Sequence, residues 1–145
     1  MTETQRFVGV WELEAIQDFF EGKRRPASGF GKAAGLLIYL ASGFMSVNFA
    51  GTSRKAFLRE FSPSPSELAA AGTAYGGYAG RWELDEPRGE VLHHVETAFV
   101  PNRVGRTIRR TYSFEEESRV LLLRPIAVSQ REEAPNRVLR WRKRT

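Results

Sequence analysis

Three side chains with acid–base or hydrogen-bonding chemistry, His93, Arg110 and Tyr112, lie on the apolar faces of two neighbouring predicted strands. Read with the period of two that strands require, the first face carries Val91, His93, Val95, Thr97 and Phe99, and the second carries Ile108, Arg110, Tyr112 and Phe114. A histidine takes or gives a proton near neutral pH, an arginine stabilises an enolate or carboxylate oxygen, and a tyrosine supplies a second donor. The pattern therefore predicts a polar group inside an apolar interior.

These two strands form a predicted hairpin across the turn from Pro101 to Gly105. Antiparallel pairing across this turn would set His93 near Tyr112 and Val95 near Arg110. A catalytic assignment of His93, Arg110 and Tyr112 then competes with a structural one, in which the three groups satisfy one another, because buried polar groups need partners. Both interpretations stay open at this point.

Several other site types are excluded by the same parity. The carboxylates predicted to point outward are those of Glu12, Glu14, Glu83 and Glu96, so a glycosidase-type pair facing one space is not expected. His93 and His94 are adjacent on a strand and face opposite sides, and the chain has no cysteine, so we expect no metal site. A haem held by His93 alone is the one cofactor with a chemical rationale. We expect no cofactor.

Length and charge limit the function classes further. The 145 residues are predicted to form one domain, 1–145, with an ordinary globular composition. The net charge of +5 comes from basic residues spread along the chain and not interleaved with exposed aromatic residues, so no nucleic-acid partner is expected. No run reaches the ~20 apolar residues of a membrane span, and no export signal is recognised, so we expect a cytoplasmic protein that does not bind membranes. The oligomeric state stays open.

The hydrophobic pattern predicts an all-β fold. Eight strands are expected, at Phe7–Ile16, Gly35–Leu40, Phe44–Phe49, Tyr78–Leu84, Val91–Phe99, Arg106–Phe114, Arg119–Arg124 and Arg137–Lys143. Trp11, Leu13 and Ala15 are expected to share one side of the first strand, and Val120 and Leu122 to point inward. Most connections are short and polar, and an up-and-down antiparallel barrel closes eight such strands without an unpaired edge.

Three segments between the strands differ from short turns. Residues 22–34 are expected to form a long loop, and residues 128–136 a polar connection. One short mid-chain helix is predicted at about 65–75: Ser64 is its cap, Pro65 stands at its first position, and Glu67 bonds back to the cap. Gly76-Gly77 is expected to end this helix.

A series of motifs carries a family resemblance. Gly9-Val10-Trp11 on the first strand, the long loop after it and the arginine-rich last strand resemble the lipocalins, in which an arginine of the final strand covers the tryptophan; here that arginine would be Arg140 or Arg142. Nearly the whole chain is similar to the bacterial and fungal lipocalin-like domain family, a group of calycin-type barrels. The motifs that carry this similarity are Leu37-Ile38-Tyr39, Gly43-x-Met45-Ser46, Tyr78-Ala79-Gly80-Arg81, His93-His94-Val95-Glu96, Pro101-Asn102, Gly105 and Arg110-x-Tyr112.

The resemblance implies a barrel that encloses a ligand, and some such barrels catalyse cofactor-free cyclisation of polyketide or terpenoid intermediates. We therefore expect a small hydrophobic or aromatic molecule as the partner, held by Trp82, Thr97, Met45, Val47, Phe99, Tyr39 and Arg124. A cyclase or isomerase would work through His93, Arg110 and Tyr112. The alternatives are a non-catalytic carrier that uses the same cavity, or a closed barrel filled by Trp82, Tyr112 and Arg124.

Overall fold

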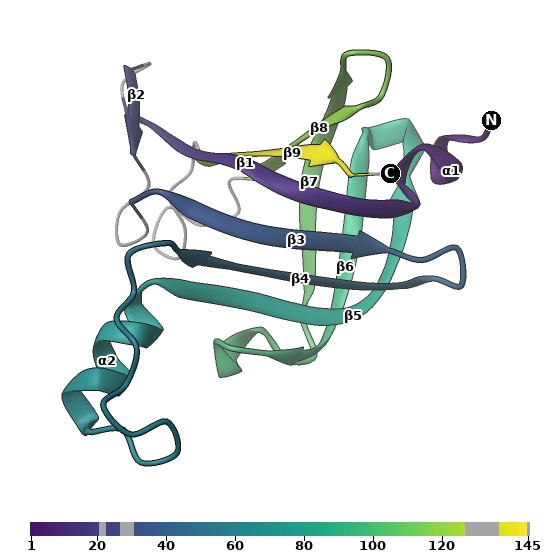
Figure 1. The fold of residues 1–145 in the computed structure, drawn as a ribbon. Helices are drawn as coiled ribbons and strands as arrows, with labels where there is room; N and C mark the ends of the chain where they lie inside the picture. Colours follow the sequence, from purple (N-terminus) through teal and green to yellow (C-terminus); the bar gives the residue numbers. More distant parts are fainter. Residues whose placement is uncertain (21–22, 27–30, 127–136, 145) are drawn as a thin grey trace.

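Antiparallel strands close into an eight-stranded up-and-down barrel in a computed structural model, which describes residues 1–20, 23–26, 31–126 and 137–144 (Figure 1). The strands of the barrel are β1 (Gly9–Phe20), β3 (Ala33–Tyr39), β4 (Phe44–Gly51), β5 (Tyr75–Asp85), β6 (Glu90–Ala98), β7 (Thr107–Glu115), β8 (Val120–Pro125) and β9 (Arg137–Lys143). Each pairs with its neighbours in the sequence, and β1 also pairs with β9, which closes the ring. The predicted all-β barrel is confirmed.

Two of the predicted connections lie partly or wholly outside the described residues. Within the expected loop 22–34 the chain forms a short strand, β2 (Lys23–Pro26), which pairs with the end of β1 and stands outside the closed ring. Residues 21–22 and 27–30 are outside the described residues, as is the predicted polar connection 128–136.

Two α-helices accompany the barrel, α1 (Glu3–Phe7) and α2 (Pro65–Thr73), and two 3-10 turns, η1 (Glu86–Arg88) and η2 (Pro101–Arg103), join strands. Ser64 and Glu67 form the predicted capping box of α2. The sequence pattern predicted a strand start at Phe7, but Phe7 is the last residue of α1, which begins at Glu3 after a capping box between Thr2 and Gln5. Neither helix is long and apolar enough to cross a membrane; this finding covers the described part of the chain.

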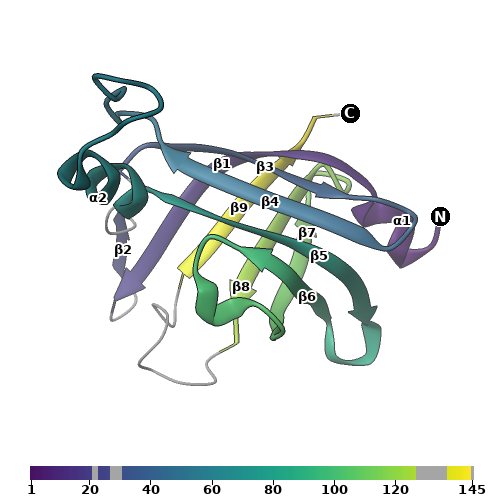
Figure 2. The ribbon, with the colours of Figure 1, turned by 90° about the horizontal axis from the view of Figure 1, so that it is seen from below.

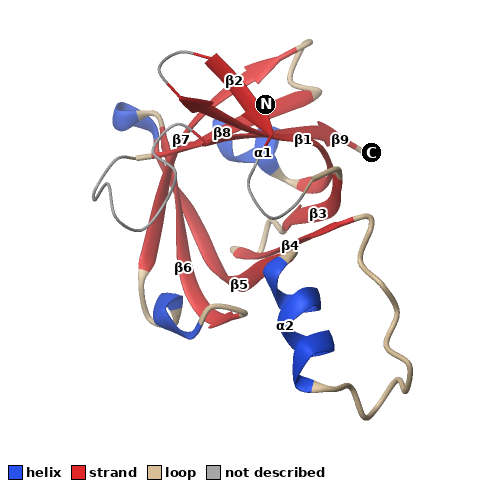
Figure 3. Ribbon diagram, turned by 90° about the vertical axis from the view of Figure 1, so that its left-hand side faces the viewer, coloured by secondary structure: helices blue, strands red, loops and turns tan. Residues whose placement is uncertain are grey.

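The two helices lie at opposite ends of the barrel (Figures 1 and 2). α1 covers one end, where the fully buried ring of Phe7 packs against an aromatic cluster of Tyr39, Trp82, Tyr112 and Phe114. α2 projects from the other end, which faces the viewer in Figure 3. The barrel therefore has one end filled with aromatic side chains and one end without such a plug among the described residues.

Gly76 and Gly77 belong to β5 and do not end the helix as predicted, because α2 ends at Thr73. A Cβ on Gly77 would lie 2.6 Å from the carbonyl oxygen of Val47, and one on Gly76 would lie 2.9 Å from the ring of Phe49. The glycine pair thus serves the close approach of β5 to β4, not a helix terminus.

Two β-bulges change which residues face the interior. In β1 the pairing with β9 slips between Leu13 and Ala15, so that Glu14 is the extra residue. Trp11 and Leu13 contact the core before the bulge, and Ile16 is the core residue after it. The predicted inward position of Ala15 was therefore wrong, because period two holds only on each side of the bulge.

The second bulge lies in β6, where Gly80 pairs with Val95 but Ala79 pairs with Thr97, so that Glu96 is the extra residue. After it Ala98 packs against the core, while Thr97 is exposed. A Cβ on Gly80 would collide with the carbonyl oxygen of His94, so only glycine allows this approach.

The register between β6 and β7 also differs from the prediction. His93 pairs with Ile108 and Val91 with Arg110, four residues away from the predicted partners Tyr112 and Val95. The ladder between β6 and β7 stops at His94, although β6 itself continues beside β5 to Ala98, and the connection that includes η2 follows. Because the shift is an even number of residues, every side chain of β7 keeps its predicted face.

The predicted orientation of β8 was wrong, because the side chains expected to point inward lie on the outer face and their neighbours point inward. Leu121 and Leu123 belong to the core, whereas Val120 and Leu122 are buried on the outer face. Across the ladder their partners are Arg142 and Arg140 of β9.

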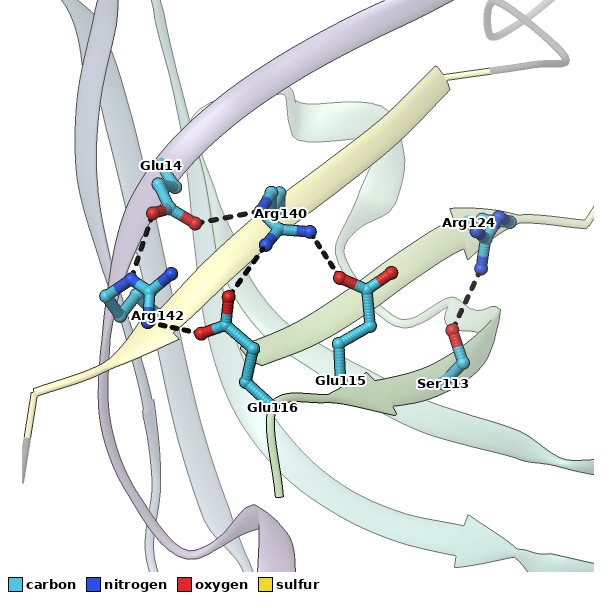
Figure 4. A network of polar contacts seen from close by, with 7 residues as sticks. All are labelled: Glu14, Ser113, Glu115, Glu116, Arg124, Arg140 and Arg142. Carbon is cyan, nitrogen blue, oxygen red and sulfur yellow. Dashed lines mark hydrogen bonds and ion pairs between the residues drawn. The ribbon is translucent and has the colours of Figure 1, made fainter. Parts of the chain in front are cut away.

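An ion-pair network covers the outer face beside these strands (Figure 4). The bulged Glu14 accepts hydrogen bonds of 2.9 Å from both Arg140 and Arg142, which also pair with Glu115 and Glu116. Glu116 has φ of 47° in the β7–β8 turn, a conformation that costs a non-glycine residue on the order of 1–3 kcal/mol. The two arginines thus hold a strained turn against the β1–β9 seam.

Candidate ligand-binding cavity

A cavity of about 300 Å³ lies inside the barrel, at the lower end of the size range of ligand sites. It lies at the end opposite α1, because its lining includes Tyr75 and Arg137, the first residues of β5 and β9. Its described lining consists of Ile16, Leu37, Val47, Phe49, Tyr75, Gly76, Gly77, Tyr78, His93, Val100, Arg103, Arg110, Leu123, Arg137, Leu139 and Trp141. The void beside His93 and Arg110 contradicts the alternative of a completely filled barrel.

His93 stands between two tyrosines. It is 1% exposed, its Nε2 lies 2.6 Å from the hydroxyl of Tyr39, and its Nδ1 lies 2.6 Å from the hydroxyl of Tyr78. Tyr39 packs on the ring of Trp82 at 4.6 Å between centroids, on the aromatic side of the barrel, whereas Tyr78 lines the cavity. The three side chains therefore connect the plugged end of the barrel to the cavity.

Burial keeps this group neutral. Desolvation, with a smaller contribution from the positive charge of Arg110, lowers the pKa of His93 from 6.5 to about 3. Desolvation also raises the pKa of the Tyr39 hydroxyl well above its usual value of 10.0. Near neutral pH the site consequently contains a neutral imidazole beside the neutral phenol of Tyr39.

Arg110 is buried and lines the cavity beside His93. On the shared face of β6 and β7 the two residues are diagonal neighbours, since Val91 pairs with Arg110 and His93 with Ile108. The predicted register, although wrong, had also made them diagonal neighbours, with Arg110 opposite Val95 instead of Val91. Of the three residues predicted to form the polar group, His93 and Arg110 are therefore brought together.

Tyr112 lies away from this cavity. Its half-buried ring packs edge-on against Phe7 at 4.8 Å between centroids, and its hydroxyl donates a 2.9 Å hydrogen bond to Glu3 of α1. Desolvation and this carboxylate raise the pKa of Tyr112 to about 12. Tyr112 thus ties α1 to the barrel, a contact that the sequence pattern could not supply because it lacked α1.

The residues predicted to hold a ligand have three different positions. Val47 lines the cavity. Tyr39, Met45 and Trp82 are buried in the core and are not among the residues that line it.

The other three predicted ligand contacts are on the outside of the barrel. Thr97 and Phe99 follow the bulge at Glu96, which turns Thr97 outward, and Phe99 is 49% exposed and packs against Tyr75. Arg124 is exposed because β8 has the opposite facing, and it donates to Ser113 at 3.1 Å (Figure 4). Their predicted inward orientation was wrong.

Tyr78 and Trp141 are among the cavity residues that were missed from sequence. Tyr78 has the same parity as Gly80 and Trp82 on β5, so the alternating pattern contained the signal. Trp141 alternates with Leu139 on β9 in the same way, and its ring is 1% exposed. Among the described residues, the Nε1 of Trp141 is the buried side-chain polar atom that has no hydrogen-bond partner.

The tryptophan of the Gly9-Val10-Trp11 motif is fully buried, and its Nε1 donates to the carbonyl oxygen of Phe7 at 2.8 Å. The cation over its ring belongs to Lys143, at 5.3 Å from the centroid. The predicted cover by Arg140 or Arg142 was wrong, because both arginines face outward and bind Glu14.

Comparisons with known proteins agree with this architecture. The family model of the lipocalin-like domain matches residues 8–144, which covers all eight strands of the barrel. A search of curated proteins and a search of solved structures found no match. With its closed barrel, its buried Gly-x-Trp tryptophan and an interior cavity, the chain belongs to the lipocalin-like domain family.

Proposed function

We propose that this protein binds a small, mostly apolar molecule in the barrel cavity and acts as a carrier or binding protein. The observation that carries the proposal is the cavity itself. Its lining is mostly aliphatic and aromatic, and a few polar groups, among them His93, Tyr78 and Arg110, converge on one region of it. This composition is typical of small-molecule sites, in which apolar contacts supply affinity and a few polar groups orient the ligand.

The state of His93 favours binding over proton transfer. Both ring nitrogens are hydrogen-bonded to tyrosines, and a pKa of about 3 leaves the imidazole unable to hold a ligand's proton near pH 7. A cofactor-free cyclase or isomerase of a polyketide- or terpenoid-type intermediate is the second candidate. Arg110 favours it, because a guanidinium beside an apolar cavity can stabilise a developing enolate.

Native mass spectrometry tests the binding function. Freshly purified protein is incubated with an extract of the cells that produce it, and a species heavier than the bare chain by one small molecule is expected. Val47→Phe, which places a ring in the cavity, should abolish this species. Asn48→Phe adds the same ring at an exposed position of β4 and should leave it unchanged.

The outcome that contradicts binding is a bare chain in both variants and in the wild type. If a ligand is identified, it is incubated with the wild type and with Arg110→Ala. Recovery of the chemically unaltered ligand from both proteins would identify a carrier. Chemical conversion of the ligand that depends on Arg110 would establish the cyclase or isomerase in place of the carrier.

A further inference from the structure

The protons of the Tyr39–His93–Tyr78 group can be counted. Two phenols and one neutral imidazole carry three polar hydrogens, and the group contains two hydrogen bonds, one on each side of His93. Each bond uses one hydrogen. One donor is therefore left over, and it belongs to a tyrosine hydroxyl.

Burial decides which tyrosine carries the extra donor. Tyr39 is 0% exposed and its hydroxyl has no partner other than Nε2 of His93 among the described residues. Leaving that O–H unpaired would cost about 1–3 kcal/mol. Tyr39 therefore donates to Nε2, and the proton of His93 is on Nδ1 and is donated to the oxygen of Tyr78. The O–H of Tyr78, a residue that lines the cavity, is left without an acceptor in this group.

A second donor in the same wall is the indole N–H of Trp141. This side chain is 1% exposed and lines the cavity, and its Nε1 has no partner among the described residues. A buried indole N–H normally has an acceptor, because leaving it unpaired costs free energy. Both donors thus lack acceptors within the described protein, and both belong to side chains that line one cavity.

The charged side chains in the wall have one sign. The described lining contains Arg103, Arg110 and Arg137 and no aspartate or glutamate. A ligand that only donates hydrogen bonds would compete with the donors of Tyr78 and Trp141.

We propose that the cavity selects ligands whose polar groups are hydrogen-bond acceptors, carbonyl or carboxylate oxygens on an apolar skeleton, and that Tyr78 and Trp141 donate to them. This inference rests on the proposed binding function and specifies its ligand class. It disfavours ammonium groups and other ligands whose polar atoms only donate hydrogen bonds. Positioning of the Tyr78 donor depends on His93 and Tyr39, which do not themselves contact the acceptor.

The test uses four probes with one bicyclic skeleton: 2-acetylnaphthalene, 2-naphthoate, 2-ethylnaphthalene and 2-naphthylmethylamine. Calorimetric titration of the full chain is expected to show that the ketone binds about fivefold to tenfold more tightly than its apolar isostere, the ethyl compound, because one additional hydrogen bond forms. The amine should bind more weakly than the ethyl compound. Comparison of the carboxylate with the ketone separates an anionic ligand from a neutral one, both of which are acceptors.

Two variants locate the donors. Tyr78→Phe and Trp141→Phe should each weaken binding of the ketone severalfold and leave the affinity for the ethyl compound within about twofold. Trp141→Phe keeps the test decisive if Tyr78→Phe fails to fold, since it disturbs no hydrogen bond of the described protein. Asn48→Phe, on the outside, serves as the unaffected control.

The outcomes separate the two proposals. Equal affinity for the ketone and the amine would overturn the proposal that the cavity selects hydrogen-bond acceptors. Ketone binding that is unaffected by Trp141→Phe and by any folded Tyr78→Phe protein would do the same. Neither result would contradict the binding function itself. No heat of binding with any probe, together with a bare chain after incubation with cell extract, overturns the binding function.

Discussion

The Tyr39 hydroxyl and Nε2 of His93 lie 2.6 Å apart inside the barrel, and neither atom has another hydrogen-bond partner among the described residues. This single contact fixes the direction of the hydrogen bonds that reach the cavity. Tyr39 must donate, since its phenol is fully buried, and the imidazole must therefore carry its proton on the nitrogen that faces Tyr78.

The first prediction is that His93 is the neutral Nδ1–H tautomer near pH 7. Long-range ¹H–¹⁵N correlation spectra distinguish a protonated from an unprotonated ring nitrogen, and the chain has only two histidines. His94→Gln removes the other set of signals and identifies those of His93. A protonated Nε2 on His93 would contradict the assignment and with it the donor role of Tyr78.

A pH-dependent loss of stability is expected from the same residue. In the folded protein the pKa of His93 is lowered from 6.5 to about 3, so between these values the unfolded chain binds a proton that the folded chain rejects. The free energy of unfolding should therefore fall as the pH decreases through this window, by at most about 1.4 kcal/mol per pH unit from this group. Urea denaturation from about pH 6.5 to pH 5 measures this slope before the carboxylates titrate.

His93→Gln is the matched variant for this slope. The glutamine amide has a donor and an acceptor for the two tyrosines but does not titrate. It should flatten the pH dependence over the same interval. A slope that persisted unchanged in His93→Gln would show that another group is responsible.

The bulged Glu14 is expected to stabilise the seam between β1 and β9 and the strained turn before β8. Hydrogen bonds from Arg142, and secondarily from Arg140, lower the pKa of Glu14. Glu14→Gln should lower the free energy of unfolding by about 1 kcal/mol at low salt, and less at high salt, because the pair is partly exposed. Glu12→Gln, whose carboxylate pairs with the exposed Arg144, should have a smaller effect. Equal losses in the two variants would argue against a special role of the bulge.

The barrel itself could be predicted from sequence because many residues, in all eight strands and the turns between them, determine it together. Alternation in each strand and short polar turns leave few closed arrangements, and an error in one strand does not change the ring. Capping residues such as Ser64 and Glu67 also act locally, so α2 was predicted at its correct start.

The wall of the cavity could be predicted only where alternation is unbroken. An extra residue at Glu14 or Glu96 reverses every orientation after it, and each bulge depends on the partner strand, which a single strand's pattern does not contain. This is why Thr97 was predicted inward although it is exposed. The inward positions of His93 and Arg110 were predicted correctly, because His93 precedes the bulge of β6 and Arg110 lies on β7, whose parity survives an even shift of register.

The last prediction compares two buried tryptophans of the core, Trp11 and Trp141, which are 0% and 1% exposed. Replacing either with phenylalanine removes similar apolar area, so the packing losses should be comparable. The polar losses differ. Trp11→Phe breaks the hydrogen bond to the Phe7 carbonyl and leaves that oxygen without its donor, whereas Trp141→Phe removes an N–H that has no partner among the described residues.

Trp11→Phe should therefore destabilise the protein by about 1–2 kcal/mol more than Trp141→Phe, measured as the difference in the free energy of unfolding in urea. The comparison also bears on ligand binding, since an indole N–H that contributes nothing to stability can still be paired by a ligand in the cavity it lines. An added acceptor ligand should accordingly stabilise the wild type more than Trp141→Phe, because it binds the wild type more tightly. Equal destabilisation by both variants would mean that Nε1 of Trp141 is already paired in the free protein, and it would remove one of the two donors from the proposed site.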